Sequence, residues 1–321
     1  MAAMCYSAQI EAEYRKYIRR FGADISIKDF AQLYWNRAQG AKLKIPKAVD
    51  AMFAEPGNAD EREIARMIAE FNAQEATRLE QEMFKQRKRL ADAERTLQTK
   101  TTKKALDDKR IATDKVQWCR DKLEALRRTN LVQDDMRIFP GWYAPVLVME
   151  NGRRVVKPMR YQCRLAGSQP SFDRQFPGCY NARRDNLEGF WRKAFGVSHG
   201  ILIAEAFFEN VSKHTMEGRK LAPGEKEQNV ILEFRPQPPQ EMLVACLWSH
   251  WSGAGEADLD SFAAITDEPP AEVAAAGHDR CIIPIKAENL DAWLSPSADL
   301  KAMHAILDDR ARPYYEHRLA A

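Results

Sequence analysis

The stretch from residue 58 to residue 139 contains neither glycine nor proline. It is rich in Glu, Arg, Lys, Ala, Gln and Leu, residue types that favour the α-helix. Apolar residues recur at helical spacing in two blocks, the first at Ile64, Ile68, Phe71, Leu79, Met83 and Leu90, and the second at Ile111, Trp118, Leu123 and Leu126. The sequence therefore predicts a long helical segment over about 58–130.

The polar stretch 96–104 separates the two apolar blocks. We expect the chain to fold back there as a helical hairpin or coiled coil, and one long helix is the alternative because no glycine marks a turn. Asp60 and Glu63 have the spacing of a capping box at the start of the segment.

The flanking sequence has a different texture. Residues 9–17 and 27–37 predict short helices, and the tail from residue 290 returns to a helical pattern. Short apolar runs bounded by Gly and Pro predict strands at 144–149, 155–160, 200–208, 230–234, 243–248 and 262–266. Asn151-Gly152 between two of these runs is typical of a hairpin turn. The expected fold class is α+β: a mainly antiparallel β core with flanking helices, forming one domain over 1–321 that the helical segment interrupts.

Composition limits the classes of function. The 49 Lys and Arg residues nearly balance the 46 Asp and Glu residues, so any contact with nucleic acid needs a local patch. The six cysteines are scattered without C-x-x-C or Cys/His zinc spacing, which favours reduced thiols and predicts no metal or cofactor. No apolar run approaches the roughly 20 residues of a membrane helix. We expect a cytoplasmic protein, associated with the nucleoid if a local patch contacts DNA.

Cys5 follows Met4 close to the start of the sequence. If translation starts at Met4, or if the residues before Cys5 are cleaved away, Cys5 presents an α-amine and a thiol on one carbon. The amine adds to an aldehyde as an imine, and the thiol then closes a five-membered thiazolidine ring. An internal Cys5 has no free amine, so this chemistry requires a processed N-terminus. We favour the later start over self-cleavage of a leader.

Several short motifs in the later part of the chain bear on this chemistry. Trp142-Tyr143-Ala144-Pro145 precedes the Asn151-Gly152 turn and Met159-Arg160-Tyr161. Further along come three motifs, Asn181-Ala182-Arg183, Phe207-Phe208-Glu209 and His278-Asp279-Arg280. In their order and spacing behind Met4-Cys5, these motifs resemble the SRAP family, the SOS response-associated peptidases, whose members process abasic sites in DNA.

The resemblance implies a function and a catalytic set. The expected function is an abasic-site sensor that forms a covalent thiazolidine crosslink between N-terminal Cys5 and an abasic site in single-stranded DNA. Autoproteolytic exposure of Cys5, and so peptidase and lyase activities, are further expectations. Glu209 and His278 are the candidates for moving protons, and Asn181 is the candidate for orienting the Cys5 amine.

Contacts with DNA are expected from Arg183 and Arg280, because each adjoins a proposed catalytic residue, with a weaker contact from Thr266. For either arginine, an ion pair with a neighbouring Asp is the alternative. The chain departs from the family pattern at its start, where Met-Cys-Gly-Arg is usual and this chain has Cys5-Tyr6-Ser7, so an early DNA-contacting Arg is missing. Tyr161 and Asn210 each occupy a position where the family typically has Trp.

Two other functions remain open at this stage. Cys, His and Asn also form the set of a cysteine hydrolase acting in trans, which needs an internal Cys5. A noncatalytic DNA-binding adaptor is the second. For the helical segment we expect either an unknown protein partner or an extension of the DNA footprint through the basic run 85–89, and we expect no membrane contact.

Overall fold

The computed structural model describes residues 7–320 apart from 12, 254 and 297–298. The chain divides into two compact units. Unit 1 takes in residues 1–33, 42–55 and 132–321, and unit 2 takes in residues 34–41 and 56–131. The fold class is α+β, as the sequence predicts.

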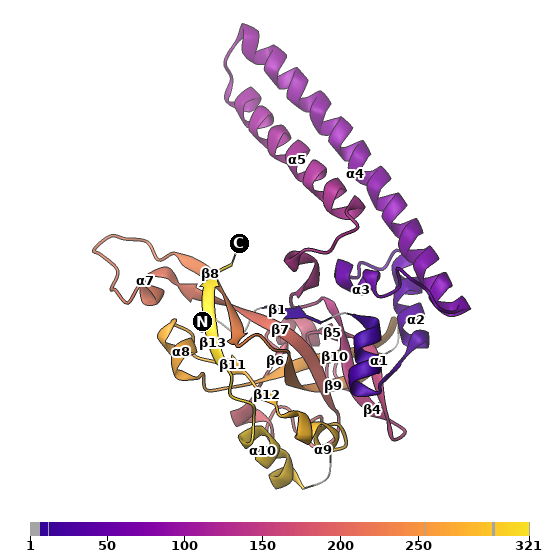
Figure 1. The fold of residues 1–321 in the computed structure, drawn as a ribbon. Coiled ribbons are helices and arrows are strands. Elements are labelled where there is room, and N and C mark those ends of the chain that lie inside the picture. Colours follow the sequence, from indigo (N-terminus) through magenta and orange to yellow (C-terminus); the bar gives the residue numbers. More distant parts are fainter. Residues whose placement is uncertain (1–6, 12, 254, 297–298, 321) are drawn as a thin grey trace. The chain divides into compact units, whose positions relative to one another are not determined.

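Unit 2 is built on a helical hairpin. Helices α4 (Ala59–Thr99) and α5 (Lys103–Arg127) lie side by side and antiparallel, joined by a short turn, as Figure 1 shows. The expected hairpin is therefore confirmed, and the alternative of one long helix is wrong. The start of α4 differs from the expected capping box, because Asn58 is the N-cap and its side chain accepts from the backbone N–H of Glu61 at 2.9 Å. The Glu61 carboxylate in turn accepts from the backbone N–H of Gly57 at 2.6 Å.

The turn of the hairpin needs no glycine because side chains cap it. Lys100 ends α4 in an extended conformation, and the Thr102 hydroxyl caps α5 by accepting from the backbone N–H of Ala105 at 3.2 Å. Between the helices, Leu79 packs with Cys119 and Leu123 in a buried cluster. Trp118, expected on the buried stripe, is 40% exposed, and its neighbour Cys119 takes the buried position.

Within the described residues, unit 1 is built on a 13-stranded sheet in which antiparallel pairs predominate. Its longer strands are β4 (Tyr143–Glu150), β5 (Arg153–Tyr161), β7 (His199–Ser212), β8 (Asn229–Gln237), β9 (Met242–Gly253), β10 (Glu256–Asp267) and β13 (Tyr314–Leu319). Its shorter strands are β1 (Ser7–Ile10), β2 (Asp24–Ile25), β3 (Arg137–Ile138), β6 (Asn181–Arg183), β11 (Cys281–Ile282) and β12 (Pro284–Ile285). Strand β7 pairs with both β4 and β9, so the order β9–β10–β5–β4–β7 closes on itself as a ring.

The remaining elements of the chain are short helices, apart from α2. They are α1 (Tyr14–Phe21), α2 (Ile27–Ala38), α3 (Lys47–Ala51), α6 (Phe172–Gln175), α7 (Lys213–Met216), α8 (Ala271–Ala275), α9 (Leu290–Leu294) and α10 (Leu300–Asp308), with 3₁₀ turns at Gln133–Met136, Arg184–Asn186 and Ala287–Asn289. No helix in the described parts of the chain is long and apolar enough to cross a membrane.

All six strands expected from apolar runs are present, and Asn151 and Gly152 both have positive φ, 51° and 74°, as the hairpin turn requires. Two expectations are wrong. Residues 9–17 do not form one helix: β1 is paired into the sheet and α1 starts at Tyr14. The tail does not stay helical, because β13 follows α10 and pairs with β8.

One apolar cluster joins the sheet to its covering helices. It includes Ile201 of β7, Ala245 of β9 and Ile265 of β10, together with Trp293 of α9 and Leu307 of α10. The alternating residues of the same strands are also buried: Leu202, Val244 and Phe262 are no more than 2% exposed. The strands near the predicted site are therefore covered on both faces, which holds their backbones in a fixed register.

Candidate active site

Glu209 and His278 form a buried pair. Glu209 is near the end of β7, His278 follows α8, and the carboxylate Oε2 lies 3.0 Å from the imidazole Nε2. The side chains are 0% and 1% exposed, respectively. A carboxylate and an unprotonated ring nitrogen are both acceptors, so this contact is favourable when one of the two groups carries a proton. The two residues belong to separate sequence motifs, and the fold brings their side chains into contact.

The backbone of Arg280 lies against the other ring nitrogen. Nδ1 of His278 is 2.9 Å from the carbonyl oxygen of Arg280 and 3.3 Å from its N–H. A neutral ring with its proton on Nε2 accepts from the N–H, and a protonated ring donates from Nδ1 to the carbonyl. The same position of the ring therefore suits both protonation states.

The His278 loop closely approaches helix α7. Gly277 has a φ of 96°, and a Cβ at this position would lie 2.9 Å from Cγ2 of Thr215 in α7. Helix α7 directly follows β7, so the strand that carries Glu209 leads into the helix that packs against the His278 loop. The backbone N–H of His278 donates to the carbonyl of Val273 in α8.

Asn181, Arg183 and Thr266 lie on one face of adjacent strands. Strand β6 runs parallel to β10, with Asn181 beside Ala264 and Arg183 beside Thr266. The intervening Ala182 and Ile265 belong to the apolar cluster, so the side chains of Asn181, Arg183 and Thr266 point to the opposite face. Asn181 is 6% exposed and Thr266 is 1% exposed.

The three residues predicted to contact DNA line one cavity of about 180 Å³, formed by Arg183, Thr266 and Arg280 together with Arg184, Asp185, Asp267, Glu268 and Asp279. The Thr266 hydroxyl has no hydrogen-bond partner among the described residues. Arg280 connects this cavity to the buried pair, because its side chain lines the cavity while its backbone contacts His278. The candidate site therefore takes in both the cavity and the pair.

Acidic residues hold the arginines of this cavity. Arg183 donates to Asp185 from Nε at 3.0 Å and from Nη2 at 2.7 Å, and Arg280 lies 3.9 Å from Asp279. The Arg183 and Asp185 side chains are 48% and 62% exposed, so their pairing is weak and a phosphate can compete for the guanidinium. The ion pair that was the alternative to DNA contact is thus present in the protein without DNA.

The start of the described chain is held beside Glu209. Strand β1 lies between β3 and β7, and Ser7 is paired with Phe208, the residue before Glu209. Gln9 is 2% exposed and donates to Glu205 of β7 at 2.7 Å. Cys5 itself lies outside the described residues.

Sequence reasoning did not identify Arg137. Its guanidinium lies 3.8 Å above the ring of Phe208, its Nε donates to the Ser7 hydroxyl at 2.9 Å, and the residue is only 8% exposed. Ser7 occupies the position where the family pattern has Arg. A guanidinium is nevertheless present beside this position, because Arg137 of β3 contacts Ser7. In the sequence, Arg137 could have been noticed as a single cation between the apolar residues Met136 and Ile138.

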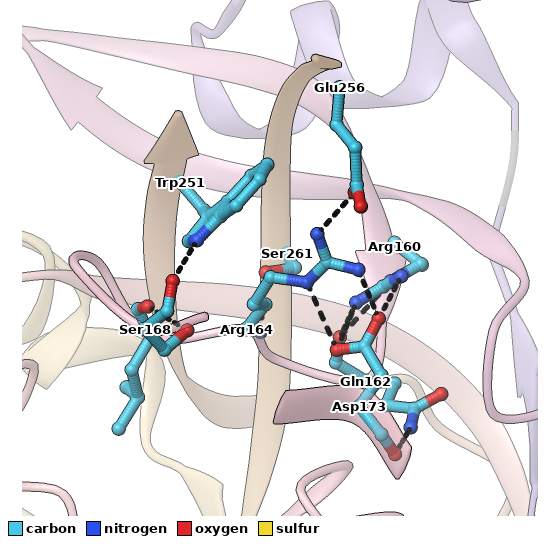
Figure 2. Close-up of polar contacts among 9 residues, drawn as sticks. Arg160, Gln162, Arg164, Ser168, Asp173, Trp251, Glu256 and Ser261 are labelled. Atoms are coloured by element: carbon cyan, nitrogen blue, oxygen red, sulfur yellow. Dashed lines mark hydrogen bonds and ion pairs between the residues drawn. The ribbon is translucent and has the colours of Figure 1, made fainter. Parts of the chain in front are cut away.

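A cluster of charged residues fixes the segment that leads from β5 to Asn181. Arg160 and Arg164 both bind the carboxylate of Asp173, at distances from 2.6 to 3.2 Å, as Figure 2 shows. Arg164 also donates to Glu256 at 2.7 Å and lies over the Trp251 ring. Although burial acts in the opposite direction, the two guanidinium groups hold the pKa of Asp173 below its ordinary value. The cluster anchors the loop before β6 to β10.

Within the described residues, no group of three or more His, Cys, Asp and Glu side chains is arranged to hold a metal ion. The family model described as SOS response associated peptidase (SRAP) matches residues 89–320. The chain belongs to the SRAP family. The match includes Asn181, Glu209 and His278, but it begins after Cys5. SRAP membership supports a DNA-damage-associated, abasic-site-related role and supports DNA binding.

Solved structures similar to this SRAP protein come from structural genomics. A protein from Bordetella bronchiseptica is 16% identical with a TM-score of 0.46, covering 58% of this chain and 87% of that one. A protein from Bacteroides thetaiotaomicron is 11% identical with a TM-score of 0.46, covering 58% and 78%. A phage-related protein from Bordetella bronchiseptica is 16% identical with a TM-score of 0.44, covering 62% and 89%. No curated protein matches the chain.

Proposed function

We propose that this protein forms a covalent thiazolidine crosslink through an N-terminal Cys5 with the ring-opened aldehyde of an abasic site in single-stranded DNA. The buried Glu209–His278 pair, 3.0 Å apart and adjacent in the sheet to the start of β1, is the observation that carries the proposal. In the sequence, Cys5 precedes Ser7, the first residue of β1, by two positions.

The chemistry requires protons to move at two atoms. The Cys5 amine adds to the aldehyde carbon, and the resulting carbinolamine loses its hydroxyl group as water when an acid protonates that oxygen, leaving an imine. The Cys5 sulfur then adds to the imine carbon, and the thiol proton ends on the nitrogen. A proton carried by the Glu209–His278 pair supplies the acid, and the pair recovers a proton from the nitrogen as the imine forms. The burial of both groups keeps water away from the imine.

Asn181 and the cavity hold the DNA in this proposal. The Asn181 amide orients the amine or the imine, as a group that neither gains nor loses a proton at neutral pH. Arg183 exchanges Asp185 for a backbone phosphate, and Arg280 and the Thr266 hydroxyl contact the same strand. Because Arg280 also supports His278, binding of the phosphate and placement of the imidazole involve one residue.

Exposure of Cys5 by self-cleavage is part of the same proposal where a leader precedes it. The thiol attacks the carbonyl carbon of Met4, the acyl group moves from nitrogen to sulfur, and water hydrolyses the thioester. Intact-mass measurement of the purified full chain tests this step directly. Loss of the first four residues in the wild type and their retention in Glu209→Gln is the expected result, and full retention in both proteins contradicts self-cleavage.

The crosslink is tested with a chain that starts at Cys5 after removal of Met4. This protein is incubated with single-stranded DNA that contains one abasic site and is run on a denaturing gel. We expect a heat-stable shifted band that disappears in Cys5→Ala, with an amine-blocked protein and with undamaged DNA. Cleavage of added peptides by the amine-blocked protein would favour a hydrolase, and function that is unchanged in Cys5→Ala would favour an adaptor.

A further inference from the structure

The turn end of the hairpin in unit 2 contains a basic cleft. The cleft has a volume of about 680 Å³ and lies between the end of α4 and the start of α5. Five of its lining residues are cations, Lys85, Lys88, Arg89, Lys100 and Lys104, against two acids, Asp92 and Asp108. The spacing along α4 places four of these residues on one face of the helix: Lys85, Lys88, Arg89 and Asp92.

Charge is concentrated at this end of the hairpin. Residues 85–110 contain ten Lys and Arg and four Asp and Glu, a net charge of +6, whereas the whole chain has only +3. Residues 59–84, on the same helix α4, contain three basic and seven acidic residues, a net charge of −4. The hairpin is therefore strongly polarised, and its turn end attracts anions.

The cations of the cleft are available to a ligand. Arg89 is paired with Asp108, but within the described residues Lys85, Lys88, Lys100 and Lys104 take part in no ion pair. All four lysines are exposed. Four unpaired ammonium groups around one cleft repel each other unless an anion lies between them.

An exposed aromatic ring adjoins the cleft. Phe84 is 74% exposed, and it precedes Lys85 by one residue and Lys88 by one helical turn. Aromatic rings beside cations are the usual platform for unpaired bases, because each base stacks on a ring while its phosphate meets a cation. A base in duplex DNA is already stacked within the helix, so this combination favours a single strand.

We propose that the turn end of the α4–α5 hairpin is a second binding site for single-stranded DNA, in which the cleft lysines hold backbone phosphates and Phe84 stacks on a base. The charges and the exposed ring would suit any single-stranded nucleic acid, and we choose DNA because the proposed function acts on DNA. The site itself rests only on the charges, the cleft and the exposed ring of unit 2. It adds affinity for undamaged strand and takes no part in the chemistry at Cys5.

The test measures binding of the full-length chain to a fluorescent, undamaged oligothymidylate by anisotropy. We expect Lys88→Glu with Lys104→Glu to raise the Kd about tenfold or more, and Phe84→Ala to raise it about fivefold. The neutral pair Lys88→Gln with Lys104→Gln should lower the slope of log affinity against log salt by about 1.4, at roughly 0.7 for each phosphate contact. The matched control is Arg120→Glu with Lys122→Glu, two exposed cations of α5 outside the cleft, for which the Kd should change less than about twofold.

The crosslinking assay separates this site from the proposed active site. At saturating DNA, Lys88→Glu with Lys104→Glu should give the wild-type crosslink yield, while Glu209→Gln should lose crosslinking and keep its affinity for undamaged strand. Wild-type affinity and salt slope in the cleft variants, with helical content unchanged by circular dichroism, would overturn the proposal. Tighter binding of duplex than of single-stranded DNA at the cleft would overturn the assignment to a single strand.

Discussion

The imidazole of His278 and the carboxylate of Glu209 meet at 3.0 Å in the interior of unit 1, where neither side chain is more than 1% exposed. A buried carboxylate without a partner is strongly destabilising, and removing one member of such a pair typically costs about 3 to 5 kcal/mol. Removing either side chain is therefore expected to destabilise the fold as well as to remove the proposed chemistry. Substitutions that test its chemistry must keep the site filled and hydrogen-bonded.

Glu209→Gln meets this requirement because the amide has the same shape and can donate to Nε2 of His278. It cannot exchange a proton, so we expect the rate of crosslinking to an abasic site to fall by about 10² to 10⁴. The measurement is the rate at saturating DNA, with the Kd for undamaged strand as a check on binding. Glu188→Gln, an exposed carboxylate that pairs with His304, is the matched control and should keep the wild-type rate. A wild-type rate in Glu209→Gln would remove the pair from the mechanism.

Asp185→Ala should strengthen DNA binding. In the free protein Asp185 occupies the guanidinium of Arg183 through two hydrogen bonds, and it adds a negative charge to the cavity that Thr266 and Arg280 share. Its removal leaves Arg183 free for a phosphate, so we expect the Kd for single-stranded DNA to fall severalfold at low salt. Asp291→Ala on α9, which carries the same charge change but is paired with Arg154, should leave the Kd unchanged. Weaker binding after Asp185→Ala would show that Asp185 holds Arg183 in the orientation that DNA requires.

His199 should make the protein sensitive to acid. Burial lowers the pKa of His199 to about 3, and its ring accepts from the N–H of Gly196 and contacts the carbonyl of Trp293. The unfolded chain, with a pKa near 6.5, binds the proton first, so stability is complete above pH 6.5 and falls as the pH drops towards 3. The expected loss from this residue is about 3 kcal/mol at pH 4. Urea unfolding of the wild type and His199→Gln at pH 7 and pH 4 measures it, and an equal pH dependence in both proteins would contradict the assignment.

Local patterns predicted most elements of the fold. The apolar runs of β4, β5, β7, β8, β9 and β10 and the Asn151-Gly152 turn have short-range causes, so they could be read from the sequence. Strand β1 could not, because its pairing with β3 and β7 depends on residues more than a hundred positions away. Strand β13 was missed for the same reason, since its partner β8 is distant in sequence.

The site could be predicted only in part. Family motifs indicated Glu209 and His278, but no local pattern says that their side chains meet, because the contact depends on the loop between β10 and β11. The cavity shared by Arg183, Thr266 and Arg280 likewise depends on the parallel pairing of β6 with β10. Arg137 was missed because a buried cation is recognised by what surrounds it, here Phe208 and Ser7. The role of Cys5 stays a prediction.

Gln162 supplies the last prediction. Its φ is 145°, in the region that favours glycine, at the position after Tyr161 where the family pattern has Gly. The guanidinium of Arg160 holds this backbone by donating to the Gln162 carbonyl from Nε at 3.2 Å and from Nη2 at 3.1 Å. Such strain costs about 1 to 3 kcal/mol, and a glycine loses about 0.5 to 1 kcal/mol through its freedom in the unfolded chain.

Gln162→Gly should therefore leave the free energy of unfolding unchanged or raise it by up to about 2 kcal/mol, whereas most substitutions at an ordered backbone position lower it. Gln162→Ala is the matched control, because it removes the same amide but keeps the Cβ and the strain, and it should be less stable than the glycine variant. Urea unfolding at pH 7 compares the three proteins. A glycine variant less stable than the alanine variant would mean that the Gln162 backbone is unstrained, and that Arg160 merely binds a carbonyl that was already in place.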